Sequence, residues 1–191
     1  MERVTFENRG NTVVGNLFKP AGFAQGTRYP AIVLTHPFGS VKEQVPTTYA
    51  KLLAERGFIT LVFDASYQGE SGGEPHFSEF PSARVEDIRR AVDFLSIHPD
   101  VDEERIGALG ICAGGGYTVN VSQTEMRIKA VAGVSTFDIV PRAATASAPS
   151  ASSRRNTAPT CSSAQPRPAR ARRPAGRSRC SPSSLTTPGS T

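Results

Sequence analysis

The chain has 191 residues and a formal net charge of +5, with 38% hydrophobic residues and no tryptophan. This length suits one domain, and no stretch approaches the roughly 18 uninterrupted apolar residues that a membrane-spanning helix needs. The N-terminal sequence MERVTFENRG lacks the apolar core of a secretory signal, and three cysteines are too few for a disulfide scaffold. We therefore expect a protein of the reducing cytoplasm, without a membrane partner.

The charge is distributed unevenly along the chain. Residues 1–141 carry 13 basic and 17 acidic side chains, whereas residues 142–191 carry nine arginines and no acidic residue. Ser, Ala, Arg and Pro make up 37 of those last 50 residues, and Leu185 is the only large aliphatic one. Such a segment buries too little apolar surface to offset the entropy of ordering. We predict two parts, a folded core over 1–141 and a disordered basic tail over 142–191.

Three interpretations of the tail stay open. It could bind nucleic acid through its arginines, but aromatic residues are not interleaved with them, so nucleic acid is not the expected partner. It could also be a plain disordered extension. The third interpretation is a shift of reading frame near Val140. Out-of-frame GC-rich codons yield mostly Ala, Arg, Pro, Ser and Gly, and the change after VAGVSTFDIV is abrupt.

The core alternates predicted strands with predicted helices. Residues 3–8 and 12–18 flank an Arg-Gly-Asn turn and predict an opening hairpin. Short apolar runs of the kind found in strands buried on both faces then occur at 31–35, 58–63, 105–110 and 128–134. These runs predict a mostly parallel sheet.

Helical spacing appears between the apolar runs. Tyr49, Leu52 and Leu53 are expected on one buried face of a first helix, with Gly57 as its stop signal. A second helix is expected to begin with Ser82 as its N-cap. Strands alternating with helices predict an open α/β sheet, whose ligands bind beyond the carboxyl ends of the strands.

At one such strand end lies the motif that carries the chemistry. Residues 110–114 read Gly-Ile-Cys-Ala-Gly, which is the G-x-S-x-G nucleophile elbow with Cys112 in place of serine. The sharp turn of an elbow requires small neighbours, which Gly110 and Gly114 supply. Cys112 is then expected at a helix N-terminus, where the dipole favours a thiolate. The alternatives are a structural cysteine or a dinucleotide-binding loop, but Cys112 occupies the second glycine position of the latter.

The elbow, HPFG at 36–39 and FDASYQGESGG at 63–73 together resemble the α/β-hydrolase superfamily, in particular its dienelactone-hydrolase-like branch. The resemblance covers about residues 3–140 and implies an α/β-hydrolase fold truncated after about the sixth strand. It implies Cys112 as the nucleophile, with the backbone N–H groups of Ala113 and Phe38 as the oxyanion hole. The expected partner is a small-molecule acyl substrate, an ester, lactone or thioester.

The same resemblance implies an acid and a histidine after the nucleophile. Here His36, His76 and His98 all precede Cys112, and Asp138 is the only acidic residue beyond Glu125. We expect impaired hydrolysis, because a base that activates water for deacylation is missing from this region. The alternatives are an acyltransferase of the same fold and a non-catalytic truncated or frame-shifted product.

The other polar residues near strand ends have simpler expected roles. His36 and Asp64 are expected to brace loops rather than act as acid or base, and Glu70 and Ser71 could line the edge of a pocket. The histidines are scattered and no cysteine pair has ligand spacing, so we expect no metal site. No cofactor is implied, and the oligomeric state is left open.

Overall fold

The computed structural model describes residues 1–137, and the predicted tail lies outside them. The described strands are β1 (Glu2–Asn8), β2 (Asn11–Phe18), β3 (Tyr29–Thr35), β4 (Ile59–Phe63), β5 (Val101–Ile111) and β6 (Ile128–Val134). The described helices are α1 (Val45–Ala54), α2 (Pro81–Ser96) and α3 (Ala113–Ser122). All six predicted strands are therefore present, with β5 longer than expected at its N-terminal end.

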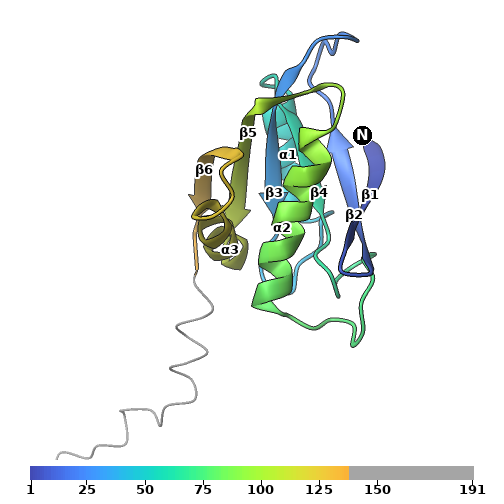
Figure 1. Ribbon diagram of the computed structural model, residues 1–191, viewed down its shortest axis with the longest axis vertical. Coiled ribbons are helices and arrows are strands. Elements are labelled where there is room, and N and C mark those ends of the chain that lie inside the picture. The colour runs from blue at the N-terminus through green and yellow to red at the C-terminus, as the bar shows by residue number, and fades with distance from the viewer. Residues whose placement is uncertain (138–191) are drawn as a thin grey trace, which may run out of the picture. The chain divides into compact units, whose positions relative to one another are not determined.

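The strands form one mixed sheet in the order β1-β2-β4-β3-β5-β6 (Figure 1). β4, β3, β5 and β6 run parallel, while β1 and β2 form the predicted antiparallel hairpin. The hairpin closes through Arg9 and Gly10, both with positive φ, and such turns match the right-handed twist of the strands they join. The predicted mostly parallel α/β sheet is confirmed.

Successive residues of the central strands face opposite sides of the sheet. In β3, Val33 packs into the larger core with Ile88 of α2, whereas Leu34 packs with Ala50 and Ala54 of α1. This alternation reflects the two-residue period of a strand. Figure 1 shows the result, with α1 on one face and α2 and α3 on the other.

Two details of the helices differ from the sequence-based prediction. In α1 the buried residues are Pro46, Ala50 and Ala54, whereas Leu52, which was expected on the buried face, is 46% exposed. The two alanines face the sheet, and their small side chains allow the helix to lie close to it. In α2 the first helical residue is Pro81 rather than a residue after Ser82. Proline is favoured there because its φ is already helical and its missing N–H needs no acceptor.

The buried stripe of α2 includes two charged residues. Its members recur at helical spacing and are Arg84, Asp87, Ile88, Ala91, Val92 and Leu95. Asp87 accepts hydrogen bonds from Asn8 Nδ2 at 2.6 Å, from Ser66 N at 2.8 Å and from Ser66 Oγ at 2.6 Å. It therefore joins α2 to the hairpin and to the loop after β4.

β6 forms the edge of the described sheet, and most of its residues are exposed. On the α1 side, an apolar groove of about 440 Å³ runs along β3, β5 and β6, with Ile32, Leu109 and Val131 in its lining.

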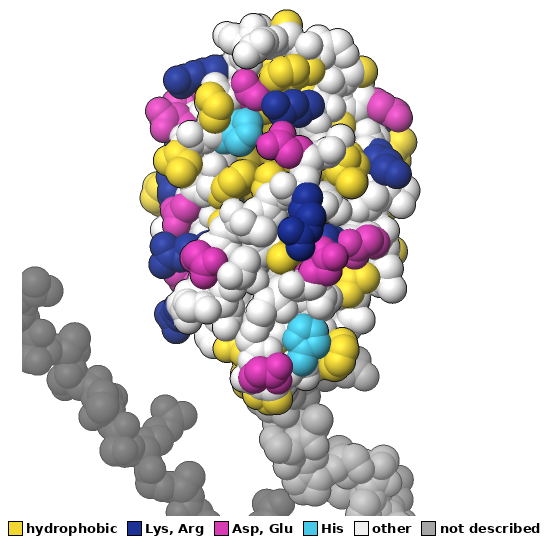
Figure 2. All heavy atoms as spheres, turned by 90° about the vertical axis from the view of Figure 1, so that its right-hand side faces the viewer, with side chains coloured by type: hydrophobic (Ala, Val, Ile, Leu, Met, Phe, Trp, Pro, Cys, Tyr) yellow, Lys and Arg dark blue, Asp and Glu magenta, His cyan; other side chains and the backbone are white. Residues whose placement is uncertain are grey.

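None of the helices in the described part of the chain is both long and apolar enough to cross a bilayer. On the face shown in Figure 2, basic and acidic side chains are interspersed.

Candidate active site

Cys112 is the single residue between the end of β5 at Ile111 and the start of α3 at Ala113. Its backbone has φ 55° and ψ −121°, in the left-handed half of φ space. Residues with a β-carbon adopt positive φ rarely, and the cost of about 1–3 kcal/mol must be met by the surrounding structure. This is the sharp strand-to-helix turn that a nucleophile elbow requires.

The packing around the turn explains why glycine stands on both sides of Cys112. A β-carbon at Gly110 would collide with the main chain of Gly114. A β-carbon at Gly114 would lie 2.5 Å from Thr35 O and 2.6 Å from His36 O. Real β-carbons do not approach backbone atoms below 3.0 Å, so α3 can lie this close to β3 only with glycine at residue 114.

Hydrogen bonds hold the Cys112 main chain from both directions. Its N–H donates to Val134 O at 2.9 Å, and its carbonyl oxygen accepts from Gly115 N at 3.0 Å and Phe137 N at 2.9 Å. The side chain is partly exposed. The thiol is therefore carried by a fixed backbone and is open to solvent on one side.

The two predicted oxyanion donors lie on segments that flank the elbow. Ala113 is the first residue of α3, and the N–H groups of a first helical turn have no acceptor within the helix. Phe38 lies in the loop from β3 to α1, and its N–H donates to no other residue within 1–137. β3 and β5 end side by side, since Thr35 is in register with Gly110.

A buried histidine and a buried arginine hold the start of that loop. His36 Nδ1 donates to Pro37 O at 2.7 Å, while Nε2 accepts from Ala65 N–H at 3.1 Å and lies 2.6 Å from Arg84 Nη1. Arg84 Nη2 also donates to His36 O at 2.6 Å. These partners fit a neutral ring with its proton on Nδ1. Burial, followed by the charge of Arg84, lowers the pKa of His36 to about 3. The expected bracing role of His36 agrees with this environment.

Arg84 matches no motif in the sequence. Its guanidinium lies 5.2 Å from the centre of the Tyr117 ring in α3, and its Nε is 3.5 Å from Glu79 Oε1. The available signal was its position, four residues before Ile88 on the buried stripe of α2. A cation in phase with an apolar stripe indicates a buried charge with partners elsewhere in the fold.

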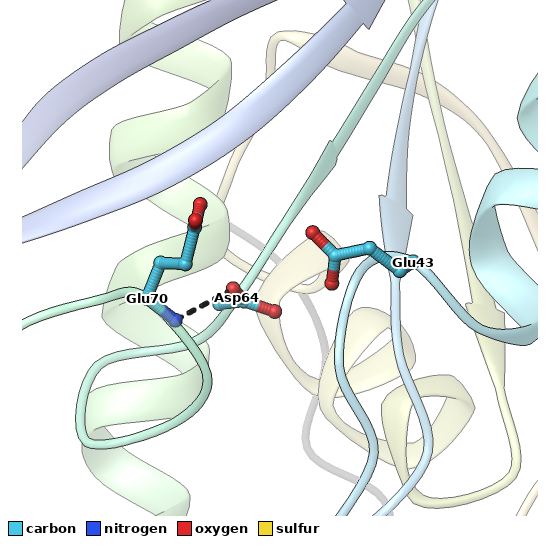
Figure 3. A group of neighbouring side chains, drawn as sticks. All are labelled: Glu43, Asp64 and Glu70. Carbon is cyan, nitrogen blue, oxygen red and sulfur yellow. Dashed lines mark hydrogen bonds between the residues drawn. The ribbon is translucent and has the colours of Figure 1, made fainter.

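Three carboxylates converge where the loops after β3 and β4 meet (Figure 3). Asp64 is wholly buried and accepts from Lys42 N at 2.7 Å, Lys42 Nζ at 2.7 Å and Glu70 N at 2.9 Å. The same ammonium lies 2.9 Å from Glu70 Oε2 and 2.7 Å from Glu43 Oε1. Asp64 therefore orders both loops, as expected.

The converging carboxylates already have a cation. Burial by itself lowers the pKa of Lys42, but the hydrogen bonds that its ammonium donates to Asp64, Glu43 and Glu70 outweigh burial and raise the pKa overall. The side chain of Lys42 is only 1% exposed, so a metal ion would have to displace a buried ammonium. We interpret the group as an ion cluster centred on Lys42, a residue that no sequence motif marked.

A cavity of about 670 Å³ lies beside the elbow, between α2 and α3. Ala113, Tyr117 and Thr136 line it, whereas Cys112 does not. Glu125, the one acidic residue after Cys112 in the described part, lies beyond the far end of α3 and is bonded to Arg127. Within the described residues, the elbow therefore carries a partly exposed thiol beside the helix N-terminus, without an acid–histidine pair.

Comparison with solved structures supports the α/β-hydrolase fold. The crystal structure of the hypothetical protein PA2218 from Pseudomonas aeruginosa superimposes with a TM-score of 0.69 and 48% identity, over 72% of this chain and 43% of that one. The α/β-hydrolase GrgF from Penicillium gives a TM-score of 0.66 and 28% identity, over 71% of this chain and 45% of that one. The predicted fold class is confirmed.

The curated relatives include both hydrolases and transferases. The thiohydrolase aneE from Aspergillus aculeatus is 33% identical over 105 residues, which cover 55% of this chain and 33% of that protein. The curated grgF of Penicillium is called a polyketide transferase. The chain spans about a third to a half of the length of the curated relatives it matches. Residues 15–152 match the model of the dienelactone hydrolase family, which is most of the chain, and the protein therefore belongs to the dienelactone hydrolase family.

Proposed function

We propose that this chain attacks acyl substrates through Cys112, forming an acyl-enzyme from an ester, lactone or thioester. The observation that carries the proposal is the backbone of Cys112, held at positive φ between a central strand and a helix N-terminus. A strained residue of this kind persists only where the surrounding structure enforces it, and such residues cluster at active sites. A relative named a thiohydrolase supports thioester chemistry in particular.

The proposed first step is acyl transfer to sulfur. The Cys112 thiolate attacks the carbonyl carbon, a C–S bond forms, and the carbonyl oxygen becomes an oxyanion. The N–H groups of Ala113 and Phe38 donate to that oxyanion, and each such donor typically contributes about 3–4 kcal/mol. The oxyanion then collapses, the bond to the leaving oxygen or sulfur breaks, and the leaving group takes a proton from solvent.

We propose that release of the acyl group from the 191-residue chain is slow. Hydrolysis of the acyl-enzyme needs a base beside the attacking water, which typically contributes about 10²–10⁴-fold. His36, whose carbonyl oxygen packs against Gly114 of the elbow, is buried, and both of its ring nitrogens have partners. The proposed kinetics are therefore one fast acylation followed by slow turnover.

A burst experiment tests the proposal. The chain is mixed with p-nitrophenyl butyrate at about pH 8, near the ordinary pKa of a thiol, and nitrophenolate is followed by absorbance. We expect a burst of one nitrophenolate per chain that Cys112→Ala abolishes. The double variant Cys161→Ser/Cys180→Ser is the matched control and should keep the burst. A burst that survives in Cys112→Ala contradicts the proposal and favours a non-catalytic product.

Acyl transfer to an acceptor other than water is the second candidate. It is favoured by the relative named a polyketide transferase and by the absence of a deacylating base among the described residues near Cys112. Adding N-acetylcysteamine as a small thiol acceptor after the burst separates the two. Faster release with formation of the butyryl thioester supports transfer, and an unchanged rate supports hydrolysis.

Two further parts of the proposal concern the cellular compartment of the protein and the origin of residues 142–191. Thiols are kept reduced in the cytoplasm, so we propose that compartment for the free thiol of Cys112, and cell fractionation would test it. We also keep the proposal of a hydrolase core followed by an out-of-frame tail, whose residues lie outside those the structure describes. The encoding DNA tests it, since a single-base shift should restore a frame with a later Asp and His.

A further inference from the structure

The loop from β3 to α1, residues 36–44, is tied down at both ends. Arg84 and Ala65 hold its start through His36. Asp64 holds its far end through Lys42. Phe38, the proposed oxyanion donor, lies between the two ties.

The tie at Lys42 fixes main chain and side chain together. Its N–H donates to Asp64 Oδ1 and its ammonium donates to Asp64 Oδ2, both at 2.7 Å. Lys42 is 1% exposed and Asp64 is 0% exposed. Charge-assisted hydrogen bonds of this length are among the strongest in proteins. Asp64 directly follows β4, which pairs with β3 in the sheet, so the far end of the loop is anchored to a rigid element.

Between the ties the chain makes a turn, in which the Ser40 N–H donates to Pro37 O at 3.3 Å. Gly39 has φ +62°, and nothing lies within 4 Å of the place where its β-carbon would be. The Phe38 side chain is 60% exposed and provides little packing of its own. The direction of the Phe38 N–H therefore depends on where the anchored ends hold the loop. A donor misplaced by about 1 Å can cost about 10²-fold in rate.

We propose that Lys42 and Asp64 are positioning residues, which hold the loop so that the Phe38 N–H faces the oxyanion formed at Cys112. This inference rests on the proposed function of Cys112. It predicts that breaking the tie slows reactions that pass through an oxyanion and spares other reactions of the same thiol. A merely structural role predicts no such distinction.

The test compares two reactions at one sulfur. Iodoacetamide alkylates the thiolate by displacing iodide and needs no oxyanion donor, whereas p-nitrophenyl butyrate acylates it through an oxyanion. The variant is Lys42→Met/Asp64→Asn, which removes both charges together, because a lone buried charge would itself destabilise the fold. Rate constants for both reactions are measured by mass spectrometry on the peptide that contains Cys112.

We expect acylation to fall by about 10²-fold, the usual effect of losing one oxyanion donor, with alkylation changed by less than about twofold. Glu43→Gln is the matched control, because Glu43 touches the same ammonium from the solvent side and should leave both rates unchanged. Adding Phe38→Pro, which deletes the N–H, should slow acylation of the Lys42→Met/Asp64→Asn variant no further.

Each other outcome overturns the inference in a recognisable way. Equal acylation rates for Lys42→Met/Asp64→Asn and the parent show that the tie does not position the donor. An equal fall in acylation and alkylation shows general disruption of the elbow. A parent chain that alkylates but does not acylate at Cys112 defeats the proposed function itself. Should the double variant fail to fold, Asp64→Asn is the fallback, because it leaves the Lys42 ammonium paired with Glu43 and Glu70. It is expected to show the same selective loss of acylation, and the absence of that loss overturns the inference.

Discussion

The α-carbon of Gly114 lies so close to the carbonyl oxygen of His36 that a β-carbon there would stand 2.6 Å from it. This contact joins the first turn of α3 to the loop that follows β3. Both partners are main chain, so neither can move aside as a flexible side chain would. The elbow and the proposed oxyanion loop are therefore set against each other by backbone packing.

Gly114→Ala should disrupt this contact. Overpacking a filled site costs about 1–3 kcal/mol, and we expect a loss of that size in the free energy of unfolding, measured with urea. Gly107→Ala in β5 is the control, because its nearest neighbour would be Ala130 O at an ordinary 3.4 Å. Equal stability of the two variants would show that α3 moves away at little cost.

His36 should make stability fall as the solution becomes acidic. Burial and the charge of Arg84 lower the pKa of His36 to about 3, below its ordinary value of 6.5. Between pH 6.5 and about 3, the imidazole of His36 is protonated in the unfolded chain but neutral in the folded chain. The contribution of His36 to the free energy of unfolding is therefore complete above pH 6.5 and is lost as the pH falls towards 3. We expect the stability advantage of the parent over His36→Gln to shrink by up to about 1.4 kcal/mol per pH unit in that range.

An NMR titration of the imidazole signals provides the independent check. The His36 signals should stay constant from pH 8 to 5 (roughly the range in which an ordinary histidine titrates). A His36 midpoint near its ordinary pKa would contradict the bracing role and reopen acid–base chemistry at this residue.

Asp87 should have the opposite pH dependence. Burial raises the pKa of Asp87 above its ordinary 3.8, although hydrogen bonds from Ser66 and Asn8 oppose the shift. The stability that it contributes is therefore complete below pH 3.8 and is lost as the pH rises through the folded-state pKa. The advantage of the parent over Asp87→Asn, measured by urea unfolding, should be largest at low pH. An advantage that grows with pH would mean that Asp87 is stabilised as a charged group.

The strand order along the chain and the place of Cys112 could be predicted, because both are encoded locally. Apolar runs of five to seven residues mark the parallel strands, and the small residues around Cys112 follow from the sharp turn. The predicted start of α2 is wrong, because Pro81 begins the helix one residue before Ser82, the predicted N-cap.

Lys42, Arg84 and Asp87 could not be assigned in the same way. Each of them has a hydrogen-bond partner more than 20 residues away in the sequence, as in Lys42 with Asp64, Arg84 with His36 and Asp87 with Asn8. Only the folded sheet brings these pairs together. The helical spacing of α2 by itself indicates only that Arg84 and Asp87 lie on the same face as the buried apolar residues. It does not indicate which residues they bind.

The central claim, that Cys112 becomes acylated, is tested most directly by finding the acyl group on its sulfur. The chain is treated with a butyryl thioester, digested, and mapped by mass spectrometry for the position of the adduct. The account predicts one butyryl group, on the peptide that contains Cys112, removable by neutral hydroxylamine and absent in Cys112→Ala. Labelling that instead falls on Cys161 or Cys180, or that persists in Cys112→Ala, would contradict it.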